Sequence, residues 1–169
     1  MTRVRPSQER TRALACPGAD KSAPSLSWVV RPLMENSRMA PENEREERGL
    51  AALAAITGGT GTAVVEGLKD IAPDLAEWII TFSYGDVMSR PGLDLKSRQF
   101  ATIAALTAMG TAAPQLKVHI AGALNVGCQP SEIVEVILQM AVFAGFPAAI
   151  NGLNLAREVF QERGVKVVA

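Results

Sequence analysis

Apolar residues recur at helical spacing along most of this chain, and this periodicity constrains the fold more than any other feature. From residue 49 to the end, the alternating pattern typical of β-strands is almost absent. Glycine and proline divide the helical pattern into segments, at about residues 50–56, 62–70, 74–82, 94–109, 114–125, 131–143 and 148–162. The sequence therefore predicts an all-α domain, a helical bundle of about six to seven helices.

Two aspartates are well placed to begin helices in this pattern. Asp74 precedes an apolar stripe at positions i, i+3, i+4 and i+7, of the kind that faces a core; its members are Leu75, Trp78, Ile79 and Phe82. Asp94 follows a Pro-Gly turn and is the expected N-cap of the next helix. That helix is apolar nearly all round after Gln99, so we expect it to lie in the middle of the core.

The first 45 residues differ in character from the rest of the chain. Residues 1–48 hold nine of the 17 Lys and Arg, and five of the ten prolines lie before residue 42. Because no helical or strand period is sustained there, we predict a disordered or loosely attached extension over residues 1–45 and a helical domain over residues 46–169. Two alternatives stay open: the acidic run at 42–48 opens a helix, or the protein begins at Met34 or Met39.

The composition excludes several classes of function. The 17 Lys and Arg are balanced by 17 Asp and Glu, which argues against a general nucleic-acid binder. The most apolar stretch, residues 136–150, is shorter than the roughly 20 residues needed to span a bilayer, and we see no secretion signal. We therefore expect a cytoplasmic protein that has neither a membrane nor a nucleic acid as partner.

The chain is poor in groups that bind metals. It has one histidine, His119, and two cysteines, Cys16 and Cys128, which do not form a CxxC pair. A zinc or iron site built on several imidazoles is therefore excluded within one subunit, and we predict no metal.

Several of the expected helices are apolar on more than one face. A bundle of about 120 residues has much surface for its volume and cannot easily bury all of these faces within one copy. In the segment 133–143, for example, the apolar residues are spread around the helix. The sequence therefore predicts a homo-oligomer rather than a monomer.

His119 is the first candidate for chemistry, because it is the only side chain here whose ordinary pKa lies near neutral pH. It lies at the edge of the apolar stripe of its helix, about one turn from Leu116 and Ala123. An imidazole in that position is partly desolvated and can face a cleft. The alternative is a packing histidine with a single hydrogen bond.

Two arginines are candidates for binding anions. Arg90 and Arg98 flank a turn and the start of a helix, where guanidinium groups can hold carboxylates in bidentate fashion. The alternative is that they form surface ion pairs with Asp86 or Asp94.

Glu135 and Cys128 each allow a functional and a structural interpretation. Glu135 shares a helical face with Glu132 and Gln139, which could line a site or simply face water. Cys128 precedes a helix whose N-terminus could lower the pKa of its thiol. The other interpretation is an unreactive thiol.

Three segments of the chain occur in an order and at spacings that we recognise. They are RPGLDLKSRQFATIAALTAMG at 90–110, QLKVHIAGALNVG at 115–127 and SEIVEVILQMAVFAGFPAAINGLNLAREVF at 131–160. With these segments, residues 74–162 resemble the carboxymuconolactone decarboxylase family. Its wider superfamily includes the alkylhydroperoxidase D enzymes, so the resemblance implies an alkylhydroperoxidase D-like bundle that assembles as a trimer or hexamer.

The peroxidase and decarboxylase branches of this superfamily differ in their cysteines. The peroxidase branch has a CxxC seven and four positions before the histidine, and here those positions are Ala112 and Gln115. Neither forms a thiolate, whereas a dithiol cycle needs two. The resemblance is therefore to the decarboxylase branch.

The resemblance implies a carbon–carbon lyase that needs no cofactor. Enzymes of this branch convert 4-carboxymuconolactone to the β-ketoadipate enol-lactone in the breakdown of aromatic acids such as protocatechuate. As CO2 leaves, electrons flow into the conjugated lactone. The protein must hold a dianionic substrate, stabilise the dienolate oxygen and deliver a proton to carbon.

Four residues receive catalytic or carboxylate-binding roles under this resemblance. His119 is the expected general acid, or the hydrogen-bond donor to the dienolate oxygen. Glu135 would orient the imidazole, and Arg90 and Arg98 would bind the substrate carboxylates.

Further residues are expected to bind the substrate. Gln99 stands where many relatives carry a glutamate, and because glutamine is neither acid nor base its role would be limited to hydrogen bonding. Trp78 and Phe100, with Phe143, would form an apolar wall that keeps water from the departing carboxylate.

Two other functions remain open at this stage. One is an antioxidant protein of the alkylhydroperoxidase or peroxiredoxin type. The other is a protein that binds, or acts on, a different small carboxylate or lactone.

Overall fold

Seven α-helices and one π-helix make up the part of the chain that the computed structural model describes, residues 42–166. They are α2 (Glu42–Thr57), α3 (Thr60–Glu66), α4 (Pro73–Trp78), the π-helix η1 (Ile79–Met88), α5 (Leu95–Met109), α6 (Ala113–Asn125), α7 (Pro130–Phe143) and α8 (Phe146–Glu162). No strand occurs within these residues, which confirms the all-α class and the expected number of helices.

The predicted N-terminal extension lies mostly outside the described residues. Helix α2 begins at Glu42, so the boundary that we placed after residue 45 falls within this helix. The acidic run at 42–48 opens the helix, as one of the two alternatives proposed.

The predicted limits of the later helices agree closely with the structure. The Asp94 side chain caps α5 by accepting a hydrogen bond of 2.8 Å from the Ser97 N–H. At the other end, Gly110 has a φ of 69°, a left-handed conformation that glycine adopts without strain and that ends the helix. Pro130 occupies the first turn of α7, where its missing N–H costs nothing.

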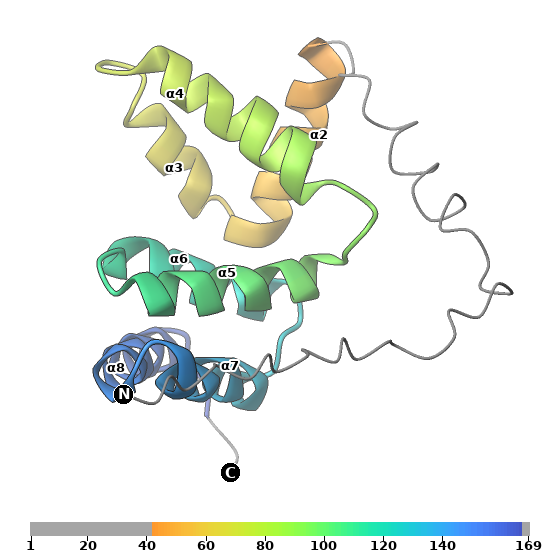
Figure 1. The fold of residues 1–169 in the computed structure, drawn as a ribbon. Helices are drawn as coiled ribbons and strands as arrows, with labels where there is room; N and C mark the ends of the chain where they lie inside the picture. Colours follow the sequence, from red (N-terminus) through yellow and green to blue (C-terminus); the bar gives the residue numbers. More distant parts are fainter. Residues whose placement is uncertain (1–41, 167–169) are drawn as a thin grey trace, which may run out of the picture. The chain divides into compact units, whose positions relative to one another are not determined.

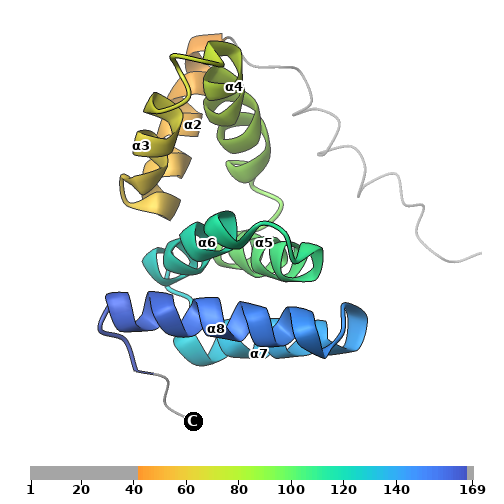
Figure 2. The same cartoon turned by 90° about the vertical axis from the view of Figure 1, so that its left-hand side faces the viewer.

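The helices form three groups within the described residues, and both views in Figures 1 and 2 show α5 and α6 between the other two. On one side lie α2, α3 and α4 with η1; on the other lie α7 and α8. Helix α5 packs against α6, α7 and α8, while α6 also packs against α2. The 94–109 helix therefore has the central place among the helices that we predicted, although one side of it, with Ala101, Ala105 and Met109, is exposed.

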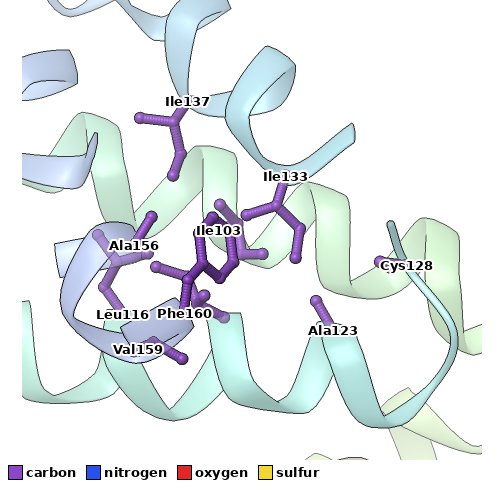
Figure 3. Packing of buried hydrophobic residues seen from close by; sticks show 10 residues of the cluster. Ile103, Leu116, Ala123, Cys128, Ile133, Ile137, Ala156, Val159 and Phe160 are labelled. Atoms are coloured by element: carbon purple, nitrogen blue, oxygen red, sulfur yellow. The ribbon is translucent and has the colours of Figure 1, made fainter. Parts of the chain in front are cut away.

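The main hydrophobic core lies where α5, α6, α7 and α8 meet. Figure 3 shows its side chains converging between these helices; they are Ile103, Leu116, Ile120, Ala123, Cys128, Ile133, Ile137, Ala156, Val159 and Phe160. A second cluster between α2, α3 and α4 with η1 is built on Leu53, Ile56, Val65 and Tyr84. Aliphatic residues dominate both, as expected for a chain with 5% aromatic residues.

Helix α2 and η1 approach each other through glycines. A Cβ atom on Gly49 would lie 2.0 Å from the carbonyl oxygen of Ile80, and one on Gly85 would lie 2.3 Å from that of Arg45. Backbone atoms cannot rotate away as a flexible side chain can, so these two positions require glycine. The same pair of elements is tied by a salt bridge of 2.6 Å between Arg45 and Asp86.

The prediction of a core-facing apolar stripe after Asp74 is wrong. The α-helix ends at Trp78 and continues as a π-helix, whose hydrogen bonds reach one residue further and change the spacing of side chains on one face. Instead of the stripe, the residues buried here are Ala76, Thr81, Tyr84 and Gly85. Trp78 and Phe82 are 58% and 60% exposed. Asp74 lies in the first turn of α4, and the N-cap is Ala72.

Large apolar side chains also gather where α7 meets α8. We call Val142, Phe143, Phe146 and Ile150 the α7–α8 apolar patch; each of its members is more than half exposed. Within residues 42–166, no helix combines the length and apolarity needed to cross a membrane.

Candidate active site

The inward face of α5 carries two polar residues among apolar ones. Gln99, Ile103 and Thr107 are spaced four residues apart, and all three are buried. The Gln99 amide nitrogen and the Thr107 hydroxyl have no hydrogen-bond partner within residues 42–166. Leaving a buried amide donor unpaired costs about 1–3 kcal/mol, so Gln99 is an unusual choice for a core position.

The side chain of Gln99 meets His119 of α6. The Gln99 Oε1 atom lies 3.0 Å from His119 Nδ1. Gly122, one turn further along α6, lies beside the same amide, and a Cβ atom there would lie 3.1 Å from the carbonyl oxygen of Ile56 and 3.4 Å from Gln99 Oε1. The His119 ring is half-buried, and burial lowers its pKa below the ordinary value.

The two candidate arginines lie at the turn that precedes α5. Arg98 donates from Nη2 to the carbonyl oxygen of Arg90 at 2.9 Å and from Nε to that of Leu93 at 3.2 Å. The proposed ion pairs with Asp86 or Asp94 are not formed: Asp86 pairs with Arg45, and Asp94 caps α5. The exposed Arg90 side chain makes no interaction with the described part of the chain, so its guanidinium is free to receive an anion.

Glu135 is not in contact with His119 in a single chain. It is exposed on α7 and makes no hydrogen bond or ion pair with any described residue. The hydrogen-bond contact of the imidazole is with Gln99 Oε1, and Glu135 as the orienting residue stays a prediction. Its neighbour Glu132 forms a capping box with Gln129 and a salt bridge of 2.7 Å with Lys96.

The three aromatic residues of the expected wall have different surroundings. Phe100 is half-buried against the main core, and the Lys96 ammonium lies 5.7 Å from the centre of its ring. Trp78 and Phe143 are 58% and 74% exposed. Residues 42–166 therefore do not enclose a site between them, and a wall that includes both needs another surface to cover them.

Cys128 is an unreactive thiol in this fold. It is 3% exposed, and burial raises its pKa to about 11. The suggestion that the pKa of this thiol is lowered is therefore wrong, because the loss of hydration outweighs the effect of the Lys96 ammonium, which lowers it. The second cysteine, Cys16, lies outside the described residues.

A cavity of about 270 Å³ opens at the far end of α5 from Gln99. Its lining is mainly apolar, with the polar side chains of Thr107, Asn151 and Asn154, and His119 is not part of it. Among the residues described, no group of three His, Cys, Asp or Glu side chains is placed to bind a metal ion.

Sequence reasoning missed the direct contact between Gln99 and His119. Its signal was present, because Gln99 is four residues before Ile103 on a helix expected to be central, and such a position points inward. What the periodicity alone does not give is the rotation of α6, which turns His119 toward that face.

Known proteins resemble this chain over most of the described residues. The family model described as "Carboxymuconolactone decarboxylase family" matches residues 73–158. A 4-carboxymuconolactone decarboxylase of Acinetobacter baylyi is 33% identical over 125 residues, covering 73% of this chain and 92% of the relative. An uncharacterised 15.0 kDa protein of Paracoccus denitrificans is 34% identical over 99 residues, 58% of this chain and 74% of the relative. Nitrosuccinic acid decarboxylase of Metarhizium robertsii is 33% identical over 86 residues, 51% of this chain and 59% of the relative.

Proposed function

Because the chain belongs to the carboxymuconolactone decarboxylase family, we propose that it is a cofactor-independent decarboxylase of a small lactone dicarboxylate. The substrate that we propose first is 4-carboxymuconolactone, with the β-ketoadipate enol-lactone and CO2 as products. The observation that carries the proposal is the half-buried His119 ring, which is held through one nitrogen by Gln99 and has the other nitrogen left for chemistry. Arg90, free of any partner among the described residues, supports an anionic substrate.

The names of two relatives point to a shared electronic requirement. Loss of CO2 from 4-carboxymuconolactone leaves an electron pair in the conjugated lactone. In nitrosuccinic acid one carboxyl group is attached to the carbon that bears the nitro group, which can accept such a pair in the same way. In both cases the negative charge is carried on oxygen, and a proton must then be added to carbon. We therefore propose that the substrate has its leaving carboxylate next to an electron-accepting group.

The residues divide the reaction between binding and proton transfer. Arg90 and Arg98 would bind the carboxylates, although two donors of Arg98 already hold the turn and leave it fewer for the substrate. His119 would protonate the dienolate at carbon after CO2 has left. The apolar residues near the site would disfavour the charged carboxylate relative to the neutral CO2 that it releases.

We also propose that the site is completed by a second copy of the chain in a homo-oligomer, a trimer or hexamer. Three observations support this assembly: Trp78 and Phe143 are exposed, the cavity does not reach His119, and the described residues leave the α7–α8 apolar patch uncovered. Covering such surfaces with another copy would bury apolar area at about 25 cal/mol per Å². It would also give His119 and Arg90 an enclosing surface that the described part of the chain does not supply.

The oligomer proposal predicts a large difference between two equally exposed positions. Replacing Val142, which is 79% exposed in the α7–α8 apolar patch, with Asp is expected to lower the molar mass measured by light scattering toward that of one chain. The charge would have to be buried in the interface, which is unfavourable without a partner. The control is Ile71→Asp, at a position 78% exposed outside the patch. A monomeric wild-type protein would contradict the proposal.

Arg90 gives a prediction on substrate binding. Arg90→Gln is expected to raise KM about 10-fold or more with kcat little changed, because a charge-assisted hydrogen bond of about 1.5–3 kcal/mol would be lost equally in ground and transition states. The control is Arg163→Gln, an exposed arginine at the end of α8. Equal KM values for Arg90→Gln and Arg163→Gln would show that Arg90 does not bind the substrate.

The proposed function is tested with freshly prepared 4-carboxymuconolactone. The ultraviolet absorbance of the lactone and the CO2 released are followed together, with nitrosuccinic acid as a second substrate. Release of one CO2 per lactone consumed supports the proposal. Binding without CO2 release from either acid would favour a different small carboxylate or lactone as ligand.

A thiol-dependent peroxidase assay examines the antioxidant alternative. The buried Cys128 thiol, with a pKa raised to about 11, does not favour it. If the wild type reduced peroxide and Cys128→Ser did not, the result would favour the antioxidant function.

A further inference from the structure

The buried amide of Gln99 faces one nitrogen of the His119 ring. The atom that faces the ring is Gln99 Oε1, 3.0 Å from Nδ1. A carbonyl oxygen has no hydrogen, so this contact is a hydrogen bond only when Nδ1 is protonated. In the neutral imidazole Nε2 then holds a lone pair and no proton.

We propose that Gln99 is a positioning residue, which fixes neutral His119 in the Nδ1–H form so that Nε2 donates a proton only when the ring is doubly protonated. The catalytic consequence rests on the proposed decarboxylation, whereas the tautomer itself does not. Because Gln99 is fully buried, it acts through His119 and does not contact substrate. This replaces our expectation that Gln99 binds the substrate directly.

The Nδ1–H form determines from which nitrogen the proton reaches the substrate. The bond between the carboxyl carbon and the ring carbon breaks, CO2 leaves, and the electron pair enters the conjugated lactone. The imidazolium then gives its Nε2 proton to carbon and returns to the neutral Nδ1–H form, still bonded to Gln99. A proton from solvent restores the imidazolium, so that one proton is consumed for each CO2 released.

A glutamine at this position leaves the imidazolium without a nearby anion to stabilise it. A carboxylate hydrogen-bonded to Nδ1 would favour the charged ring and raise its pKa, whereas an amide of the same shape carries no charge. Burial, which lowers the pKa of His119, is therefore not offset at this contact. The neutral resting ring is the expected result.

Other charged side chains on the helices around α6 do not replace that missing anion, since burial alone accounts for the shift in the pKa of His119. Several of them pair with one another, as Lys96 does with Glu132 and Lys117 with Glu158. The charged residues concerned are Glu44, Arg45, Glu46, Glu47 and Arg48 on α2, Lys96 and Arg98 on α5, Glu132 and Glu135 on α7, and Arg157, Glu158 and Glu162 on α8.

The tautomer can be measured without substrate. The chain has one histidine, so a ¹⁵N-labelled sample free of any histidine tag gives two ring-nitrogen signals that need no assignment among residues. Above the pKa of His119, long-range proton–nitrogen correlation should show Nδ1 protonated in the wild type. In Gln99→Leu, which keeps a similar volume without the acceptor, this preference should be lost.

The matched control is Thr107→Val on the same inward face of α5. It removes the other unpartnered buried polar group, keeps the shape of the side chain and should leave the tautomer unchanged. Protonation of Nε2 in the wild type, or the same tautomer in Gln99→Leu, would overturn the proposal.

A second variant links the hydrogen bond to catalysis. Gln99→Glu should raise the pKa of His119 measured by NMR and move the falling limb of kcat/KM to higher pH, because the acid form then persists further. A rise of one unit would increase the imidazolium fraction up to about 10-fold at pH values above the pKa. An active Gln99→Glu variant in which the pKa of His119 is unchanged would contradict the role of Gln99 as the residue that positions the ring. If the wild type shows the Nδ1–H tautomer but decarboxylates neither acid, the proposed function is contradicted and the role of Gln99 is not.

Discussion

Replacing His119 with Ala is expected to lower kcat by about 10²–10⁴-fold, the usual contribution of a positioned general acid. The decarboxylation leaves a carbanion equivalent that must be protonated, and His119 is the only histidine in the chain. Two other residues cannot substitute for it, because Cys128 is buried with a raised pKa and the amide of Gln99 is not an acid. The measurement is kcat with 4-carboxymuconolactone, together with circular dichroism to establish that the variant is folded.

Two further variants separate the loss of the acid from the loss of packing. His119→Gln keeps an amide that can hydrogen-bond Gln99 but has no titratable group, so it should be as slow as His119→Ala. Val118→Ala removes a half-buried side chain from the neighbouring position of α6 and should leave kcat within about 3-fold, as expected of a change that does not touch the proton donor. A folded His119→Ala variant with wild-type kcat would show that the proton comes from elsewhere.

Much of the fold could be predicted because its signals are local. The Asp94 cap, Gly110 and Pro130 mark helix ends through backbone chemistry that does not depend on distant residues. The prediction failed after Asp74, where a π-helix replaces the expected regular helix. Helices α2 and η1 also approach each other closely at Gly49 and Gly85, a tertiary contact that a period of 3.6 residues does not contain.

The candidate site was predictable in its residue types and less so in its contacts. His119 stands out as the single histidine, and its partner Gln99 lies 20 positions earlier on another helix. Which side chain meets the ring depends on how α5 and α6 are rotated against each other. The same holds for Arg98, whose guanidinium is bound to backbone carbonyls of its own turn rather than to an acidic side chain.

The second large effect concerns stability: Gly49→Ala is expected to lower the free energy of unfolding by about 3 kcal/mol, the upper part of the range for overpacked contacts. The new Cβ would lie 2.0 Å from the Ile80 carbonyl oxygen and 2.8 Å from its carbon. Neither atom can move unless α2 and η1 separate, and separation would loosen the cluster built on Leu53 and Ile56.

The direction of the change in stability distinguishes two explanations for Gly49→Ala. Helix propensity alone predicts the opposite result, since alanine in a helix interior is about 1 kcal/mol better than glycine. The control is Gly92→Ala in the turn before α5, where a Cβ would meet nothing within 4 Å and a small gain of about 0.4–1 kcal/mol is expected. Thermal unfolding at one protein concentration should show Gly49→Ala melting roughly 10 °C below the wild type. An unchanged or higher melting temperature would mean that α2 and η1 are not in backbone contact at Gly49.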